Sequence, residues 1–516
     1  MMMMSSILVS ILVAGLIAWG VKLLHWVWLR PKRLERLLRQ QGLNGNSYRL
    51  LLGDMKDLIS AVKHEQFKPI QLSDNLPPHI FPYFYQIIAK YGENCFIWFG
   101  ATPRLMISDP QLMKEILARP DVFNKPKPDP IGETVAGGLL FLEGDKWAKH
   151  RKIINPAFHI DKLKNMVPAF HLSCSNMIAK WEALFPSINN GNADCVEIDV
   201  WPFIEDFSGD VISRVAFGSS HEEGRRIFEL QKEQVKLVLE LMQFMFIPGW
   251  RFVPTGANRK SKAMSEEIRS VLKGMIKKRE KAMERGEGMD GDLLGTLMEW
   301  NQKETPQGGM SIDDVVKECK LFYFAGSETT SLLLLWTMVM LSKHHQWQSR
   351  ARDEVLQVFG DKHPSYDGLS RLKIVSMILN EVLRLYPPAP LIARGPTKTV
   401  KLGEMTVPVG VELMLLIGLM HHDPKIWGDD AGEFKPERFS DGILNSRAQS
   451  SSSYIPFSSG PRVCIGQNLG MIEAKIAIAM ILQRFSFELS PSYLHAPFLI
   501  ITLQPQHGAP LLLRKL

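Results

Sequence analysis

The chain has 516 residues, 45% of them hydrophobic and 22% charged, which is the composition of a folded globular protein with a sizeable core. Its formal net charge of +7 suits an acidic partner or an anionic membrane surface, and no basic stripe interleaved with aromatic residues indicates nucleic-acid binding. The five cysteines show no CxxC or Cys/His zinc spacing, so the sequence predicts reduced thiols in a cytosol-facing protein.

Residues 7–29 form the first predicted element, a long apolar segment. As a helix it would be about 35 Å long, enough to span a bilayer with some tilt. A basic run follows, and the positive-inside rule places that side in the cytoplasm. We therefore predict a lumenal N-terminus over residues 1–6, a transmembrane signal anchor over 7–29, a basic linker over 30–60 and a single domain over 61–516. A cleaved signal peptide is the disfavoured alternative, because no small-residue cleavage site closes the apolar run.

Helical patterns dominate the rest of the chain. The longest helix begins at Ser311, an N-cap residue with Asp314 three positions later, and its apolar pattern continues to about Leu341. Further helices are expected at Ala263–Arg285, Ala351–Phe359, Leu372–Tyr386 and Gly466–Phe485. Strand-like segments are short, and they are Cys95–Phe99, Leu105–Ser108, Thr406–Pro408 and Glu412–Ile417. The predicted fold class is mainly α with a small β part.

The long helix is interrupted by the sequence Ala-Gly-Ser-Glu-Thr-Thr at residues 325–330. Gly326 would allow a flat ring to approach the helix closely. Glu328 beside Thr329 places an acid next to a hydroxyl, a pair that can relay protons. The plainer interpretation is a polar step in a core helix, with hydroxyls bonded to the i−4 carbonyl.

Two other pairs of side chains lie one helical turn apart. Trp147 and Arg151 share a helix face, where a stacked surface pair is the simplest interpretation. Glu381 and Arg384 form an i,i+3 pair, a kind of ion pair that is common and weak on surfaces. A Phe-Lys-Pro-Glu-Arg-Phe segment that contains Arg438 follows further along the chain.

The residues around Cys464 form the most specific motif, Phe-Ser-Ser-Gly-Pro-Arg-Val-Cys-Ile-Gly. A lone cysteine is usually a small buried hydrophobic residue. Here Gly460 and Gly466 permit a tight loop against a flat cofactor, and Arg462 can pair with a carboxylate. The helix expected after Gly466 would direct its N-terminal amides at a thiolate. The loop therefore predicts an axial thiolate for haem iron, which favours O–O cleavage.

Together these motifs resemble the cytochrome P450 family, whose Phe-x-x-Gly-x-Arg-x-Cys-x-Gly signature the Cys464 loop matches at all of its fixed positions. The resemblance runs from about residue 90 to the end, and it is nearest to the plant branch that includes secologanin synthase. It implies the family fold, with haem between the long central helix and the helix after the Cys loop. Two departures are a proline-rich hinge reduced to Pro31 and Gly470 where the branch usually has Ala.

The resemblance implies roles for the motif residues. Cys464 is expected as the axial iron ligand, with Thr329 holding the bound oxygen species and Glu328 in the proton-delivery route. Glu381, Arg384 and Arg438 are expected as a buried structural triad. The other residues expected at the cofactor are Phe457, Gly460, Arg462, Gly466, Trp147, Arg151 and Arg394.

The activity implied is that of a monooxygenase of the endoplasmic reticulum membrane, with a cytosolic catalytic domain. Heme b would be the cofactor, O2 a substrate and NADPH–cytochrome P450 reductase the electron donor, which would dock near the basic surface around Trp147. An iridoid, triterpenoid or hormone-like diterpenoid would be the apolar substrate. Its expected lining segments are Pro126–Leu142, Phe244–Pro254, Leu321–Ala325, Ala389–Ile392 and His495–Ile501.

Two other functions remain open at this stage. A haem-thiolate isomerase or lyase would rearrange peroxides without a reductase, and the presence of Thr329 and Glu328 argues against it. A non-catalytic haem-binding membrane protein would form a ferrous–CO complex but yield no NADPH-dependent product.

Overall fold

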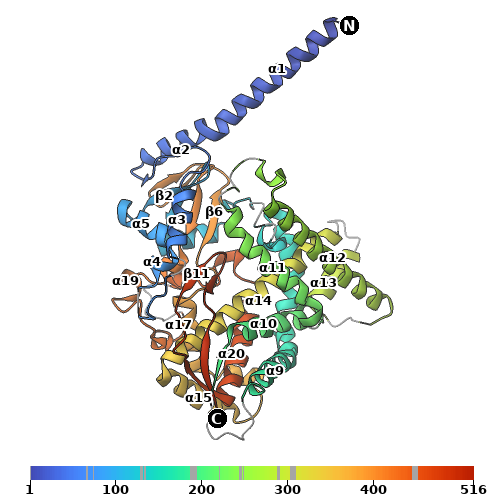
Figure 1. Cartoon of the computed structure of the whole chain (residues 1–516), viewed down its shortest axis with the longest axis vertical. Helices are drawn as coiled ribbons and strands as arrows, with labels where there is room; N and C mark the ends of the chain where they lie inside the picture. The colour runs from blue at the N-terminus through green and yellow to red at the C-terminus, as the bar shows by residue number, and fades with distance from the viewer. Residues whose placement is uncertain are drawn as a thin grey trace.

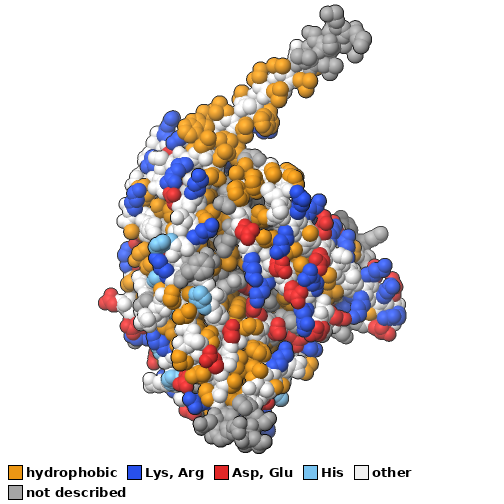
Figure 2. Space-filling view, viewed as in Figure 1, with side chains coloured by type: hydrophobic (Ala, Val, Ile, Leu, Met, Phe, Trp, Pro, Cys, Tyr) orange, Lys and Arg blue, Asp and Glu red, His pale blue; other side chains and the backbone are white. Residues whose placement is uncertain are grey.

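The N-terminal helix stands away from the rest of the chain in the computed structural model (Figure 1). Helix α1 (Met2–Leu24) continues through the π-helical turn η1 (His25–Leu29) into α2 (Arg30–Arg39). From Ser10 to Leu24 its side chains are exposed and mostly apolar (Figure 2), and the apolar window within residues 10–39 has no part buried in the protein, as expected of a membrane anchor. The structure describes residues 2–516 except 66–67, 74, 128–131, 133–134, 186–194, 220, 243, 245–246, 248, 288–290, 303–308 and 444–450.

The basic linker predicted over residues 30–60 is instead packed against the domain. Leu34 and Leu38 lie one turn apart on α2 and bury their side chains with Trp98, while the basic residues of α2 face outward. Tyr48 donates a hydrogen bond of 2.7 Å from its hydroxyl to the carbonyl oxygen of Val27. The prediction followed charge alone and missed the apolar face between the charges.

Helix α14 (Ile312–Lys343) is the longest buried element and confirms the predicted central helix. The Ser311 hydroxyl accepts a hydrogen bond of 3.1 Å from the Asp314 amide, which is the predicted N-cap. The helices that pack directly against α14 come from both halves of the chain, and they are α10 (Trp201–Phe217), α11 (His221–Leu241), α12 (Gly256–Glu284), α13 (Leu293–Gln302), α15 (His345–Phe359), α17 (Lys373–Leu385) and α20 (Gln467–Arg484).

The remaining helices complete the fold. They are α3 (Met55–Glu65), α4 (Pro77–Ile80), α5 (Pro82–Tyr91), α6 (Pro110–Ala118), α8 (Gly144–Ile154), α9 (Ile160–Glu182), α16 (Tyr366–Leu369), α18 (Ile417–Met420) and α19 (Pro424–Trp427). One of them, α8, reaches α14 through side chains, since Lys146 pairs with Asp314 and His150 with Glu318. Short 3₁₀ turns are η2 (Gly138–Leu140), η3 (Asn155–Phe158), η4 (Trp250–Phe252), η5 (Pro436–Phe439), η6 (Ser451–Ser453) and η7 (Gly460–Arg462).

The β part consists of small sheets at the edge of the helical body. A six-stranded sheet has the order β1-β2-β3-β9-β6-β4, a three-stranded sheet has the order β10-β13-β5, and two hairpins pair β7 with β8 and β11 with β12. The strands are β1 (Asn44–Gly45), β2 (Cys95–Phe99), β3 (Thr102–Ile107), β4 (Phe123–Asn124), β5 (Cys195–Asp199), β6 (Ile392–Pro396), β7 (Val400–Leu402), β8 (Met405–Val407), β9 (Glu412–Leu415), β10 (Phe485–Leu489), β11 (Pro497–Leu499), β12 (Leu503–Pro505) and β13 (Pro510–Lys515). The predicted fold class, mainly helical with a small β part, is confirmed.

Candidate functional site

Cys464 lies in a tight loop between η7 and α20. Gly460 has a φ of +71°, and a Cβ there would stand 2.4 Å from the carbonyl oxygen of Leu117, so only glycine fits. The Cys464 amide donates a 3.0 Å hydrogen bond to the carbonyl oxygen of Phe457, which closes the loop. At Gly466 a Cβ would meet nothing nearer than the Cys464 Sγ at 4.0 Å, so the space beside the sulfur is open.

The Cys464 side chain is accessible. Desolvation by the surrounding protein raises the pKa of its thiol, while hydrogen bonds from the amides of Gly466 and Gln467 lower it. The N-terminus of α20 directs its amides at this sulfur, which favours the anion. A metal cation at the same place would further favour the thiolate.

The burial of α14 is interrupted in the middle of the helix. Residues 324–329 are half-buried, whereas the helix is buried directly before and after them. This stretch contains the predicted motif at 325–330 except for Thr330, which is buried. The Thr329 hydroxyl donates a 2.8 Å hydrogen bond to the Ala325 carbonyl oxygen, the i−4 bond of the plainer interpretation. Glu328 accepts from the side chains of Thr502 and Gln504, a contact that the sequence did not reveal.

Gly326 packs closely against α10. A Cβ at this position would lie 2.6 Å from Cδ1 of Ile212 on α10. The small residue therefore serves the packing of α14 against α10. Helix crossings this close admit glycine where any larger residue would need its neighbour to move.

Basic side chains from four separate segments gather beside the Cys464 loop. The Arg462 Nη1 donates to the Leu142 carbonyl oxygen at 2.7 Å, and its second amino group pairs with Glu143. The Arg151 Nη1 donates to the Val463 carbonyl oxygen at 2.9 Å. The predicted pair of Trp147 and Arg151 thus meets the predicted Arg462, whose Cζ lies 4.1 Å from the centroid of the Trp147 ring.

Lys125 completes this cationic group and was not predicted. Burial lowers the pKa of Lys125 to about 7, and repulsion from Arg394, Arg462 and Arg151 adds to the effect. Burial and Arg462 likewise lower the pKa of Arg394 to about 10. The carboxylate of Glu143 opposes this lowering of the pKa for Lys125, Arg394 and Arg462, so these cations share its negative charge.

This excess of partly buried positive charge fits the two carboxylates of a haem propionate pair. Together with the accessible thiol of Cys464, these residues fit a bound haem, whose iron would take Cys464 as its protein ligand. Among the residues that the structure describes, no group of three or more His, Cys, Asp or Glu could hold a metal ion by itself.

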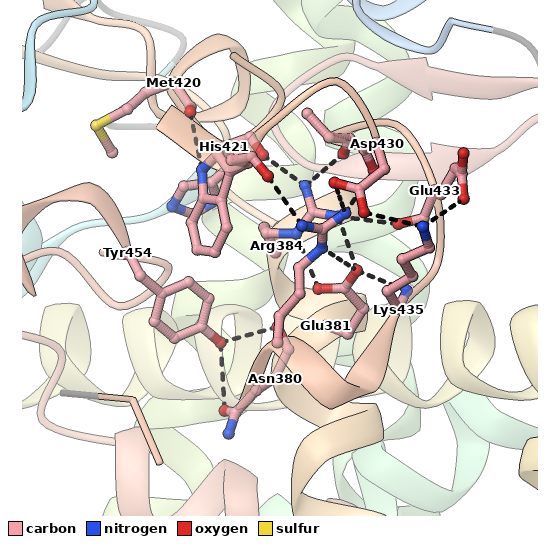
Figure 3. A network of polar contacts seen from close by, with 12 residues as sticks. Asn380, Glu381, Arg384, Met420, His421, Asp430, Glu433, Lys435 and Tyr454 are labelled. Carbon is pink, nitrogen blue, oxygen red and sulfur yellow. Dashed lines mark hydrogen bonds and ion pairs between the residues drawn. The ribbon is translucent and has the colours of Figure 1, made fainter. Parts of the chain in front are cut away.

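Glu381 and Arg384 come together in a buried network (Figure 3), and Arg438 joins it. Both Glu381 oxygens accept from Arg384, at 2.7 and 2.8 Å, and both side chains are fully buried. The Arg438 Nε lies 3.5 Å from Glu381. The network also contains Asp430, whose carboxylate pairs with Arg438 at 2.6 Å and with Lys435 at 2.9 Å. These hydrogen bonds and ion pairs lower the pKa of Asp430 to about 2, and Lys435 is the largest cause.

Arg384 also holds the backbone around this network. It donates to the carbonyl oxygens of His421, Ala431 and Glu433, at 2.8, 2.6 and 3.1 Å. Tyr454, a few residues before the Cys464 loop, donates from its hydroxyl to the carbonyl oxygen of Asn380 on α17 (Figure 3). The triad therefore links α17 to the segment that leads into the Cys464 loop.

Comparisons with known proteins give the same family as the motifs. The family described as Cytochrome P450 matches residues 70–506. The chain is 52% identical to cytochrome P450 CYP72A219 of Panax ginseng over 513 residues, which is 98% of each chain. It is 50% identical to cytochrome P450 72A15 of Arabidopsis thaliana over 512 residues, 99% of each. It is 49% identical to the echinocystic acid 23-monooxygenase of Saponaria officinalis over 519 residues, 98% of each.

Proposed function

The chain belongs to the cytochrome P450 family and is a monooxygenase, and from this premise we propose that it hydroxylates a pentacyclic triterpenoid acid. Enzymes of this family carry haem and receive electrons from NADPH through a reductase. Haem bound through Cys464 would supply activation of O2, so that one oxygen atom enters a C–H bond and the other leaves as water.

The residues of this chain would bind the cofactor and move protons. Arg462, Arg394, Arg151 and Lys125 hold the propionates, because their unbalanced positive charge lies beside the Cys464 loop. Gly460 and the amides of Gly466 and Gln467 fix and stabilise the thiolate. Thr329 orients oxygen at the accessible break in α14, and Glu328 delivers protons there. The triad orders the loop and takes no part in the chemistry.

The triterpenoid assignment rests on the relative whose name specifies echinocystic acid, which is 49% identical over 98% of each chain. An apolar cluster beside the accessible part of α14 supports it. Val135, Val235 and Val238 are buried there, and Phe324 and Ile500 pack against them. Such a surface suits a rigid hydrocarbon skeleton. The predicted lining segments Pro126–Leu142 and Phe244–Pro254 lie partly outside the described residues.

The proposed function also includes a membrane location and a redox partner. We place α1 in the endoplasmic reticulum membrane as a single-pass anchor, with the basic face of α2 and the catalytic domain on the cytosolic side. NADPH–cytochrome P450 reductase would dock at the exposed basic side chains of α8. His150 also lies on α8, but its side chain is buried and bonded to Glu318 at 2.6 Å, so it does not belong to this exposed surface.

The test is a product screen in microsomes that contain the protein and reductase. We expect NADPH-dependent hydroxylation of at least one pentacyclic triterpenoid acid, with no turnover of iridoid or diterpenoid substrates at the same concentration. Product from an iridoid or a diterpenoid alone would overturn the substrate class. Product formed with peroxide but not with NADPH and reductase would overturn the reductase-dependent activity.

A further inference from the structure

Glu328 is held by the C-terminal hairpin formed by β11 and β12. The Thr502 hydroxyl donates a 2.7 Å hydrogen bond to the Glu328 Oε1, and the Gln504 side-chain amide donates to the same oxygen. Thr502 is buried, with 4% of its surface exposed. Gln504 also donates to the Thr502 hydroxyl at 3.4 Å. Two neutral donors on one hairpin therefore fix the direction of this carboxylate.

The hairpin makes a second contact with α14, further along the helix. The Trp336 Nε1 donates a 2.9 Å hydrogen bond to the Leu503 carbonyl oxygen. Trp336 and Glu328 are eight residues apart, or about 12 Å along the helix axis. On the other side, the Leu503 amide donates to the Pro388 carbonyl oxygen at 3.1 Å. These contacts on both sides give the hairpin one position relative to Glu328.

The tip of the same hairpin is apolar. Ile500, two residues before Thr502, packs against the cluster of Val135, Val235 and Val238, and Phe324 of α14 packs against the same cluster. Phe324 lies one turn before Glu328 on α14. A hydrocarbon ligand against this cluster would therefore touch the segment that carries the donors to Glu328.

We propose that Thr502 and Gln504 are positioning residues that hold Glu328 in the geometry for proton delivery, so that the hairpin contacting substrate also controls the acid. The inference rests on the proposed function of Glu328. In the productive reaction, substrate RH, O2, NADPH and H⁺ give ROH, H2O and NADP⁺. When protons reach oxygen without hydroxylation, O2, NADPH and H⁺ give H2O2 and NADP⁺. Loss of the hydrogen bonds that position Glu328 should shift electrons from substrate hydroxylation to H2O2 formation.

The contact itself is tested by hydrogen exchange of the full-length haem protein in lipid nanodiscs. Glu328→Leu removes the acceptor of both hydrogen bonds and should speed exchange in residues 497–506 by about tenfold. Gln504→Leu leaves the Thr502 hydrogen bond in place and should speed exchange less. The double variant should be no faster than Glu328→Leu alone, because that variant already lacks the Gln504 contact. Gln506→Leu is the matched control, because the Gln506 side-chain oxygen has no hydrogen-bond partner among the described residues, and it should leave exchange unchanged. Additive effects of the two substitutions would overturn the contact.

The function of the contact is tested with reductase and a triterpenoid acid that the wild type hydroxylates. Thr502→Val should lower product per NADPH by about tenfold and raise H2O2, with KM for the substrate unchanged. Thr502→Ser keeps the hydroxyl and should restore coupling. An increase in KM alone, or equal coupling in Thr502→Val and Gln506→Leu, would overturn the proposal. If the wild type hydroxylates no triterpenoid acid, the proposed substrate class fails, and the exchange cycle decides the positioning role by itself.

Discussion

The guanidinium group of Arg462 stacks over the indole ring of Trp147, with Cζ 4.1 Å from the ring centroid. This contact joins the Cys464 loop to α8, two segments far apart in the sequence. A stacked guanidinium keeps its amino groups free for hydrogen bonds in the ring plane, and here they bind Leu142 and Glu143. The pair therefore sets the position of Arg462, one of the cations that we propose to bind the haem carboxylates.

Lys125 should contribute to haem retention although its sequence context does not indicate it. Lys125→Met removes one of the four clustered cations, and we expect haem to dissociate about tenfold faster, as for loss of one charge-assisted hydrogen bond. Transfer of haem to apomyoglobin measures this rate. Lys127→Met is the matched control, because Lys127 is exposed two residues away, and its rate should equal that of the wild type. Equal rates for both variants would remove Lys125 from the propionate site.

The buried triad should dominate stability near the Cys464 loop. Arg384→Met leaves the Glu381 carboxylate buried without its cation, and we expect a loss of about 3–5 kcal/mol in the free energy of unfolding. Arg514→Met breaks an exposed pair with Glu488, and its loss should stay below about 1 kcal/mol. Urea unfolding of the haem protein measures both. Similar losses in the two variants would show that burial of the triad carries no special weight.

Gly326 should be required for helix packing. Gly326→Ala places a methyl group against Ile212, and we expect a destabilisation of about 1–3 kcal/mol. Ile212→Ala removes the atoms that would clash, so the double variant should be more stable than the sum of the single changes predicts. Thermal unfolding of the wild type, the two single variants and the double variant gives the double-mutant cycle. Strict additivity would contradict the contact between α14 and α10.

Glu473 should make stability depend on pH. It is buried on α20, and its pKa is raised to about 8 by burial, although a 2.7 Å hydrogen bond from the Ser208 hydroxyl opposes the shift. The folded state thus keeps a proton that the unfolded state loses above its ordinary value of 4.5, so this contribution to stability is present below pH 4.5 and is lost as the pH rises to about 8.

Glu473→Gln should remove this dependence. We compare the Tm of the variant with that of the wild type at two pH values. The difference, variant minus wild type, should be at least about 2 °C larger at pH 8 than at pH 5. The control is Glu488→Gln at an exposed position, where the difference from the wild type should be the same at both pH values. A Glu473→Gln difference that does not change with pH would contradict a neutral carboxyl group in the core.

The elements predicted well from sequence are those with local signals. Helix α14 has a capping residue and a long apolar pattern, and the Cys464 loop has a motif in which glycine and cysteine positions are fixed by backbone geometry. What was missed depends on tertiary contacts. Lys125, Asp430, Thr502 and Gln504 carry no local pattern, and they reach the site only because distant segments fold together.

Gly326 and the segment at residues 30–60 also show that sequence patterns do not reveal tertiary contacts. The sequence marks Gly326 as a position of close approach, but the contact with Ile212 on α10 depends on the fold and carries no local signal. The segment at 30–60 was judged by its charge, while Leu34 and Leu38 buried its other face. Local sequence identifies unusual residues, and only the fold says what they touch.

The central claim is that Cys464 is the thiolate ligand of haem iron. The most direct measurement is the ferrous–CO difference spectrum of the full-length protein in membranes, recorded for the wild type and for Cys464→Ser. The wild type should show the Soret shift typical of a thiolate ligand, and Cys464→Ser should lose it while it still enters the membrane. A wild-type spectrum without that shift, or an unchanged spectrum in Cys464→Ser, would contradict the claim.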